Sequence, residues 1–269
     1  MTLDVAISTY SPNGIKRVEK MLPSPKDGVK YVVSWQEHEN ASLPDSIRNR
    51  EDVEVYRYEE KGLSNNRNNA IEHCRGDVVL ISDDDLVYHP DFACRILNTF
   101  KNNPDLDLGV FKINFLRPKS YPVNKCKLRL PLPKNYYCSS VEIAFRREKV
   151  SRLKFWNKIG LGNPELLCGE DELFLIAALK HNYNCFFINE EIASHLTEST
   201  GDKLNDGILR GQGFIMGVIY PYSSLIRLPL KAYRTSKTKE SPFFHILWQL
   251  IKGNIKSYFY KKRIPAECL

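Results

Sequence analysis

Three adjacent aspartates, Asp83, Asp84 and Asp85, directly follow an apolar run in the segment GDVVLISDDDLVYHP. The run over 78–81 is short, partly β-branched and preceded by a glycine, which predicts a buried strand. Carboxylates this close repel one another unless a cation is present. Mg²⁺ and Mn²⁺ take oxygen ligands and often join one or two carboxylates to substrate phosphates. The triplet therefore indicates a site for a divalent cation and a diphosphate, with a solvated acidic turn as the alternative.

The elements that must position the aspartates alternate along the first half of the chain. Strands are expected over 4–9, 29–35, 53–56 and 78–81, and helices over 13–22, 63–76 and 90–104, with Ser64 as the cap of the second helix. Such alternation implies a parallel sheet covered by helices on both faces. Ligands bind outside the carboxyl ends of these strands, so residues 1–105 are expected to form a Rossmann-like nucleotide-binding half.

The second half of the chain is less regular. Strands are expected over 108–115, 139–146 and 185–189, the last followed by a short turn. An amphipathic helix is expected over 169–182, with acidic residues in its first turn. The Pro- and Lys-rich stretch over 117–134 predicts an exposed loop.

Composition narrows the class of protein. The chain has 269 residues, of which 42% are hydrophobic and 26% charged, as in ordinary globular proteins. Its 7 cysteines form no CxxC pair, which favours reduced thiols over a disulfide framework or a zinc site. The first residues lack a basic stretch of the signal-peptide kind, so a cytoplasmic location is expected.

The C-terminal part of the chain accounts for the whole net charge of +7. From Pro221 onward, ten Lys and Arg residues face two acids, which gives +8 for this part. The uncharged stretches 211–226 and 241–251 are shorter than the ~20 residues of a spanning helix. Peripheral contact of residues 211–263 with the cytoplasmic face of a membrane is one interpretation, and helices packed on the catalytic domain are the other. No sequence motif supports binding to nucleic acid.

Four segments occur in an order that resembles the family 2 glycosyltransferases, which have the GT-A fold. They are VAISTYS (5–11), GLSNNRNNAI (62–71), VVLISDDDLVYHPDF (78–92) and GEDELF (169–174). The resemblance implies an α/β protein with a mostly parallel, Rossmann-like sheet flanked by helices. It also implies a catalytic domain over 1–202, with a nucleotide-binding half (1–105) and an acceptor-binding half (106–202). Residues 203–269 would then form a basic, helical C-terminal region.

The resemblance gives the aspartates separate roles. Asp85 would ligate Mn²⁺ or Mg²⁺, Asp83 would contact the ribose or the sugar of the donor, and Asp84 could share the ligation. His195 matches a histidine that completes the metal site in some family members, and imidazole suits Mn²⁺. The alternative for His195 is an ordinary core or surface histidine.

Residues of the donor site follow from the same resemblance. Thr9 and Tyr10 match a turn that contacts the nucleoside, although a loop packed on the sheet explains them as well. Arg67 would reach the nucleotide, hold the aspartate loop or simply lie on the surface. Family members often have an acidic pair where this chain has Trp35, so the base of the nucleotide is left open. Trp35 either stacks on that base or belongs to the core.

The resemblance also points to a catalytic base. Inverting sugar transfer needs a carboxylate that accepts the proton of the acceptor hydroxyl. Glu170 and Asp171 match the acidic pair that supplies it in the family, and Asp171 is the favoured residue of the two. Both also lie where acids cap a helix, which is the alternative.

Together these residues predict a metal-dependent, inverting glycosyltransferase. It would move a sugar from a nucleotide-sugar donor to a glycan or lipid-linked acceptor in surface polysaccharide synthesis. The alternatives are a nucleotidyltransferase that uses the same aspartates and a non-catalytic protein that binds sugar nucleotides. A nucleotidyltransferase often has a Gly-rich loop after the first strand, whereas STYSPNGIKR contains one glycine.

Overall fold

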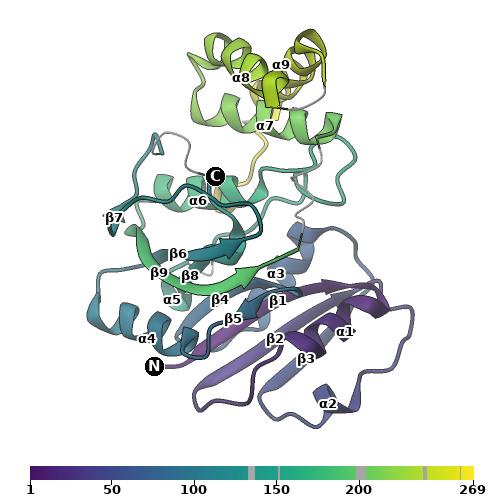
Figure 1. The fold of residues 1–269 in the computed structure, drawn as a ribbon, viewed down its shortest axis with the longest axis vertical. Coiled ribbons are helices and arrows are strands. Elements are labelled where there is room, and N and C mark those ends of the chain that lie inside the picture. Colours follow the sequence, from purple (N-terminus) through teal and green to yellow (C-terminus); the bar gives the residue numbers. More distant parts are fainter. Residues whose placement is uncertain (133–136, 151, 198–203, 239–240, 261) are drawn as a thin grey trace. The chain divides into compact units, whose positions relative to one another are not determined.

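A computed structural model describes residues 1–132, 137–150, 152–197, 204–238, 241–260 and 262–269 (Figure 1). The chain divides into two compact units. Unit 1 consists of Met1–Lys61, Asn65–Lys154 and Ala178–Thr197, and unit 2 of Gly62–Ser64, Phe155–Ala177 and Glu198–Leu269. Residues 155–177, which the sequence analysis placed in the catalytic domain, thus group with the C-terminal helices.

Unit 1 is built on one mixed sheet in the order β3-β2-β1-β4-β8-β6-β9-β5, with β7 paired to β9. The adjacent strands β3, β2, β1 and β4 are parallel to one another, and β8 is antiparallel to both β4 and β6. Their bounds are β1 Leu3–Tyr10, β2 Val29–Gln36, β3 Val53–Tyr58, β4 Val78–Asp83, β5 Val87–Tyr88, β6 Leu108–Phe115, β7 Cys126–Lys127, β8 Ile143–Arg146 and β9 Cys185–His195.

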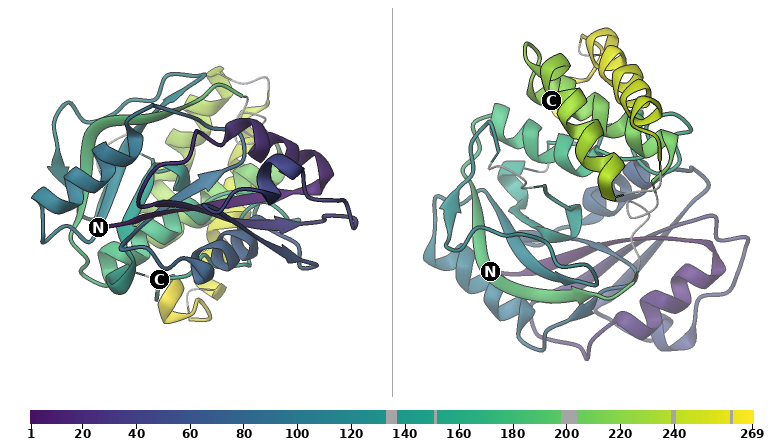
Figure 2. Two further views of the ribbon diagram at one scale, coloured as in Figure 1. Left: turned by 90° about the horizontal axis from the view of Figure 1, so that it is seen from below. Right: turned by 45° about the horizontal axis from the view of Figure 1, so that its top comes forward.

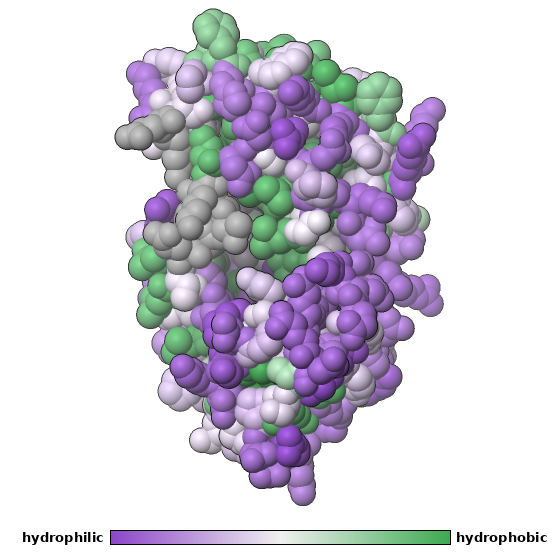
Figure 3. Space-filling model, turned by 90° about the vertical axis from the view of Figure 1, so that its right-hand side faces the viewer, coloured by the Kyte–Doolittle hydropathy of each residue, from purple (hydrophilic) through white to green (hydrophobic). Residues whose placement is uncertain are grey.

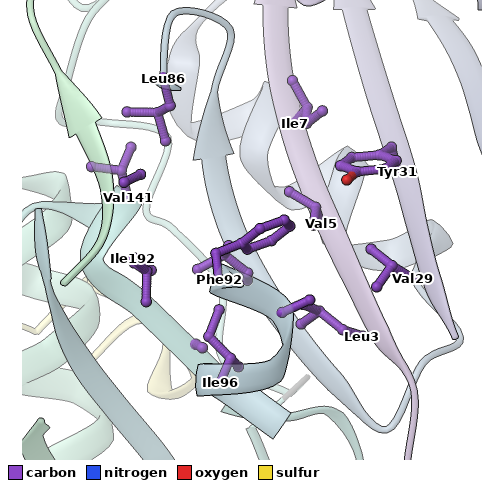
Figure 4. Packing of buried hydrophobic residues seen from close by; sticks show 14 of the residues in the cluster. Leu3, Val5, Ile7, Val29, Tyr31, Leu86, Phe92, Ile96, Val141 and Ile192 are labelled. Carbon is purple, nitrogen blue, oxygen red and sulfur yellow. The ribbon is translucent and has the colours of Figure 1, made fainter. Parts of the chain in front are cut away.

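Helices lie on both sides of this sheet (Figure 2). They are α1 Ser11–Met21, α2 Asp45–Arg48, α3 Leu63–His73, α4 Phe92–Asn102 and α5 Arg147–Val150, with a 3-10 turn over Ser140–Glu142. Alternate residues of β1 point to the same face, and Leu3, Val5 and Ile7 pack against Phe92 and Ile96 of α4 (Figure 4). This buried cluster holds β1 and β4 in place, so the residues at their carboxyl ends have a fixed position.

Unit 2 contains the first turns of α6 (Glu170–Lys180) and the helices α7 (Asp206–Ile219), α8 (Ser224–Thr238) and α9 (Phe243–Tyr260), followed by a 3-10 turn over Ala266–Cys268. A Cβ on Gly213 of α7 would lie 2.0 Å from the Leu250 carbonyl oxygen of α9, and one on Gly253 of α9 would lie 1.8 Å from the Arg210 carbonyl oxygen of α7. Only glycine allows backbones to approach so closely, and the two helices therefore pack directly against each other.

The predicted elements agree with the structure except in four places. Ser64 is not a cap, since α3 begins at Leu63 and the Ser64 hydroxyl donates to the Ile159 carbonyl at 3.0 Å. The predicted strand over 139–146 starts as a 3-10 turn. The predicted loop over 117–134 contains β7 and the buried Lys119. His195 lies within β9, which continues past residue 189 because register shifts opposite β6 accommodate the polar residues there.

Candidate active site

The carboxyl ends of the parallel strands bring the sequence-predicted residues of unit 1 to one edge of the sheet. In the parallel register Ser8 of β1 lies opposite Asp83 of β4, and Thr9 lies opposite Trp35 of β2. The Asn66 amide of α3 donates to the Thr9 carbonyl at 2.8 Å and ties this helix to the end of β1. The expected clustering at the strand ends is therefore what the structure shows for Thr9 and the aspartates.

Asp83 pairs with Arg67. A terminal guanidinium nitrogen of Arg67 lies 3.1 Å from Oδ1 and 3.3 Å from Oδ2 of Asp83. The Arg67 side chain is buried, which excludes the alternative of an ordinary surface arginine. A buried guanidinium needs a paired anion, so Arg67 fixes the direction of the Asp83 carboxylate. Of the alternatives for Arg67, this geometry favours the one in which it holds the aspartate loop.

Asp84 turns into the protein. Nε of Arg17 donates to Oδ1 at 3.0 Å, a terminal nitrogen of Arg17 donates to Oδ2 at 2.8 Å, and the Thr9 hydroxyl donates to Oδ2 as well. Burial raises the pKa of Asp84, while the bonds from Arg17 and Thr9 act against that rise. A carboxylate held by a bidentate arginine and a hydroxyl is a poor metal ligand, and the structure gives Asp84 a positioning contact with α1 and β1.

Sequence reasoning missed Arg17. It lies in the middle of α1, within the helix expected over 13–22. Its guanidinium also lies 5.9 Å from the centre of the Tyr10 ring. A cationic residue on the first helix after the strand that ends in Thr9 and Tyr10 is the signal that could have revealed it.

Asp85 faces His195. Nε2 of His195 lies 3.2 Å from Oδ1 of Asp85, and the Thr197 hydroxyl donates to Oδ2 at 2.6 Å. Antiparallel pairing of β5 with β9 produces this contact, because Val87 lies opposite Ser194 and thus brings the residues beside them together. Thr197 is a second residue that the sequence analysis did not identify.

The two side chains shift each other's ionisation. Burial acts to raise the pKa of Asp85, but hydrogen bonds from His195 and Thr197 outweigh it and the pKa is lowered. The hydrogen bond to Asp85 raises the pKa of His195. The structure therefore brings the Asp85 carboxylate and the His195 imidazole into contact, although the two residues are far apart in the sequence.

Trp35 and Tyr10 have opposite environments. The Trp35 ring is fully buried, its indole nitrogen donates to the Ser11 carbonyl at 2.9 Å, and the Arg57 guanidinium lies 4.9 Å from its centre. No face of the indole is exposed for stacking on a base, so the structure shows the core position for Trp35. The Tyr10 ring is exposed at the end of β1 and is accessible to a ligand.

Glu170 and Asp171 begin α6 in unit 2. Gly169 precedes them with φ +110, and its carbonyl accepts the first helical bond from Leu173 at 2.9 Å. Glu170 is buried and packs on Gly160, where a Cβ would lie 2.8 Å from the Glu170 carboxyl carbon. Asp171 is partly exposed. Gly169, in the left-handed region, thus directly precedes the helix. Of the two acids that follow it, Glu170 is buried and Asp171 is partly exposed.

The donor set around Asp85 fits a hard divalent cation that also takes ligands from a substrate. Over the described part of the chain, His, Cys, Asp and Glu side chains nowhere gather in a group of three that could hold a metal ion. Asp85 and His195 offer one carboxylate and one imidazole, a pair suited to Mn²⁺ when phosphate oxygens complete the coordination. Asp83 is directed to Arg67 instead.

Solved structures share this fold. The chain is similar to the crystal structure of S. aureus TarS 1–349, with a TM-score of 0.56 and 16% identity over 98% of this chain and 73% of that one. For the complex of TarS 1–349 with UDP-GlcNAc the TM-score is 0.60 and the identity 13%, over 98% and 92%. The predicted fold class is confirmed: the chain has a GT-A-like α/β fold with a mostly parallel sheet and C-terminal helices.

A family model matches part of the sequence. Residues 36–154 match the family model described as Glycosyl transferase family 2. This match confirms the predicted resemblance to the family over that part of the chain.

A curated relative is the glucosyl-dolichyl phosphate glucuronosyltransferase of Haloferax volcanii, 30% identical over 112 residues. The matched region is 39% of this chain, which spans about a third (36%) of the length of that relative.

Proposed function

We propose that this protein transfers a sugar from a nucleotide-sugar donor to a glycan or lipid-linked acceptor, with inversion at the anomeric carbon and with Mn²⁺ or Mg²⁺. The observation that carries the proposal is the pairing of Asp85 with His195 beside Asp83 at the carboxyl end of β4. A family 2 match over residues 36–154 covers this strand end and supports the same chemistry.

Asp85 and His195 would hold the cation. When bound, the cation would neutralise the negative charge of the departing diphosphate. Asp83, oriented by Arg67, would contact the ribose or the sugar of the donor. Tyr10 would contact the nucleoside from the end of β1, where its ring is exposed.

Asp171 would accept the proton in the transfer step. The acceptor hydroxyl oxygen forms a bond to the anomeric carbon while the bond from that carbon to the diphosphate oxygen breaks. The nucleoside diphosphate leaves with the electron pair, and the hydroxyl proton passes to the Asp171 carboxylate. This role rests on the family resemblance of the segment GEDELF and on the partial exposure of Asp171.

The names of related proteins suggest the substrates. TarS was solved in complex with UDP and with UDP-GlcNAc, which favours a uridine nucleotide as the donor carrier. The Haloferax volcanii relative is named for a glucosyl-dolichyl phosphate, which favours a lipid-linked acceptor. Surface polysaccharide synthesis is a process in which such a donor and acceptor meet.

The experiment is a panel of UDP-, dTDP- and GDP-sugars, assayed for hydrolysis with and without Mn²⁺. Asp85→Asn keeps the shape of the side chain but removes the charge, so we expect Mn²⁺-dependent hydrolysis to fall ~10²-fold and nucleotide binding in Mn²⁺ to weaken. The matched control is Asp84→Asn, whose carboxylate is bound to Arg17 and Thr9, and it should keep the response to Mn²⁺.

Three results would contradict the proposal. Unchanged nucleotide affinity of Asp85→Asn in Mn²⁺ would exclude the aspartate triplet as the metal site. Release of pyrophosphate from a nucleoside triphosphate and a sugar phosphate would indicate a nucleotidyltransferase. Binding of donors without any turnover, over the whole panel and with acceptors present, would indicate a non-catalytic protein.

A further inference from the structure

Two helices of unit 2 expose apolar stripes. On α8, the exposed stripe consists of Ile226, Leu230 and Tyr233, which follow one another at helical spacing. On α9, it consists of Phe244, Trp248, Ile255 and Phe259. With Tyr222 these side chains are all at least 46% exposed. We call these eight residues the α8–α9 face. Figure 3 shows hydrophobic side chains gathered over these helices at the top of its view.

The opposite sides of the same helices are packed inside unit 2. Leu228 and Ala232 of α8 and Ile246 and Leu250 of α9 form a buried cluster with Leu209 of α7. The α8–α9 face is therefore left over after the helices have satisfied their packing within the unit. Exposed apolar side chains at this density, on both helices, mark a surface for interaction.

The helices α8 and α9 run antiparallel and contact each other along their length. The Tyr258 hydroxyl of α9 donates to the Pro221 carbonyl before α8 at 2.6 Å, and Ser224 of α8 lies 3.3 Å from the Asn254 side chain of α9. The start of α8 thus lies beside the end of α9. Both stripes therefore belong to one continuous pair of helices.

Cations accompany the aromatic rings. The Lys252 ammonium lies 5.2 Å from the centre of the Trp248 ring, the Lys237 ammonium 4.7 Å from that of Tyr233 and the Arg227 guanidinium 4.1 Å from that of Tyr220. The part of the chain from Pro221 onward has a net charge of +8. Lys231 is partly buried, and burial lowers its pKa, so it contributes less to this surface than the exposed cations do. The surface complements a negatively charged partner with an apolar interior.

We propose that the α8–α9 face docks on the surface of a membrane that contains anionic phospholipids. Aromatic rings would enter the boundary between headgroups and acyl chains while lysines and arginines meet the phosphates. Among the described residues no helix is both long enough and apolar enough to cross a bilayer, so the contact is peripheral. The face is smaller than the stretch 211–263 expected from the sequence, because α7 is largely buried.

The test uses the full chain and vesicles of phosphatidylcholine, with and without one quarter phosphatidylglycerol. Trp248 is a native reporter: it is 55% exposed, whereas Trp35 and Trp156, the other two of the 3 tryptophans, are 0% and 6% exposed. We expect sedimentation with the anionic vesicles only, weakening as salt rises. Trp248 emission should shift to the blue and be quenched by lipids brominated on the acyl chains.

Two variants distinguish binding through the α8–α9 face from nonspecific binding through any exposed apolar side chain. Phe244→Ser with Phe259→Ser should lower vesicle binding at least tenfold, while Val123→Ser, which removes an 83% exposed apolar side chain in unit 1, should leave it unchanged. Donor hydrolysis should be the same in all three proteins. A loss of donor hydrolysis would therefore bear on the proposed function and not on the docking face.

Three outcomes would overturn the proposal. The first is the absence of sedimentation with anionic vesicles at low salt. The second is binding without quenching of Trp248, which would place the contact elsewhere. The third is a dimer in sedimentation velocity that Phe244→Ser with Phe259→Ser abolishes, without vesicle binding, since the face would then join two copies of the chain.

Discussion

Within unit 1, the Glu142 carboxylate differs from those of Asp83 and Asp85 in its exposure to solvent. Glu142, in the 3-10 turn before β8, accepts bonds from the Lys119 ammonium, from the Tyr121 hydroxyl at 2.6 Å and from the Ser139 backbone at 2.7 Å. The side chains of Glu142 and Lys119 are 0% exposed. Asp83 and Asp85 also have partners, yet 30% and 25% of their side chains stay exposed.

The difference separates stability from function. Glu142 is surrounded by donors, and no ligand can reach it, so its interactions stabilise the strands around it. Asp83 and Asp85 lie on a strand end where partners orient the carboxylate but leave room for a ligand. A polar contact alone therefore does not single out a candidate functional acid, whereas an oriented and partly exposed carboxylate is a candidate.

Glu170 and Asp171 of unit 2 differ in exposure in the same way, and a change at Asp171 is expected to have the largest effect on activity. Asp171 is partly exposed and Glu170 is buried, so exposure favours Asp171 for the proposed role of catalytic base. Asp171→Asn should lower sugar transfer ~10²–10⁴-fold, the usual contribution of a general base. Donor affinity should remain that of the wild type, because the proton moves only in the transition state. Single-turnover transfer and nucleotide binding measure the two quantities.

The control for this prediction is Glu170→Gln. We expect it to lower the free energy of unfolding by about 1 kcal/mol, as loss of an acid near a helix start does, and to leave transfer nearly unchanged. Equal losses of activity in both variants would break the distinction between exposed and buried acids. An active Asp171→Asn with an inactive Glu170→Gln would give the role to Glu170.

The next largest effect is on stability. Glu142→Gln leaves the Lys119 ammonium buried beside a neutral amide, and removal of one partner from a buried ion pair costs ~3–5 kcal/mol. Unfolding in urea measures this loss, while the activity of the folded fraction should not change. Adding Lys119→Met removes the orphaned charge and should recover most of the stability. A stable Glu142→Gln that has lost activity would mean that Glu142 belongs to the active site.

The smallest expected effect concerns Arg17 and its ion pair with Asp84. Asp84 is more buried than Asp83 and Asp85 but less buried than Glu142. The Arg17 side chain is 42% exposed, so solvent screens its pair and Arg17→Gln should cost about 1 kcal/mol in unfolding free energy. Arg17→Lys keeps the charge without the planar fork and should fall between that variant and the wild type. Loss of the Mn²⁺ requirement for donor hydrolysis in Arg17→Gln would show that Asp84 is a metal ligand after all.

Much of the fold was predictable because its signals are local. Short apolar runs predicted the strands of the parallel half, and apolar spacing predicted the helices α1 and α4. The helix expected over 169–182 is present as α6, but the expectation that it is amphipathic was wrong, because the six consecutive residues 173–178 are all buried. Ser64 misled because a serine before an apolar periodicity is a cap signal, and its actual partner, the Ile159 carbonyl, is 95 residues away. Lys119 lies in a stretch that composition marks as exposed, and its burial depends on a glutamate 23 residues later.

The sequence by itself determined that three carboxylates follow a buried strand and that the segment around this strand resembles the family 2 glycosyltransferases. Only the tertiary structure decided what each carboxylate contacts. Arg67 is 16 residues from Asp83, Arg17 is 67 from Asp84 and Thr197 is 112 from Asp85. Neighbouring side chains at a strand end point in different directions, so each aspartate meets a different element of the fold. The physical reason is that local sequence fixes the backbone at the strand end, whereas sheet pairing and helix packing fix what surrounds it.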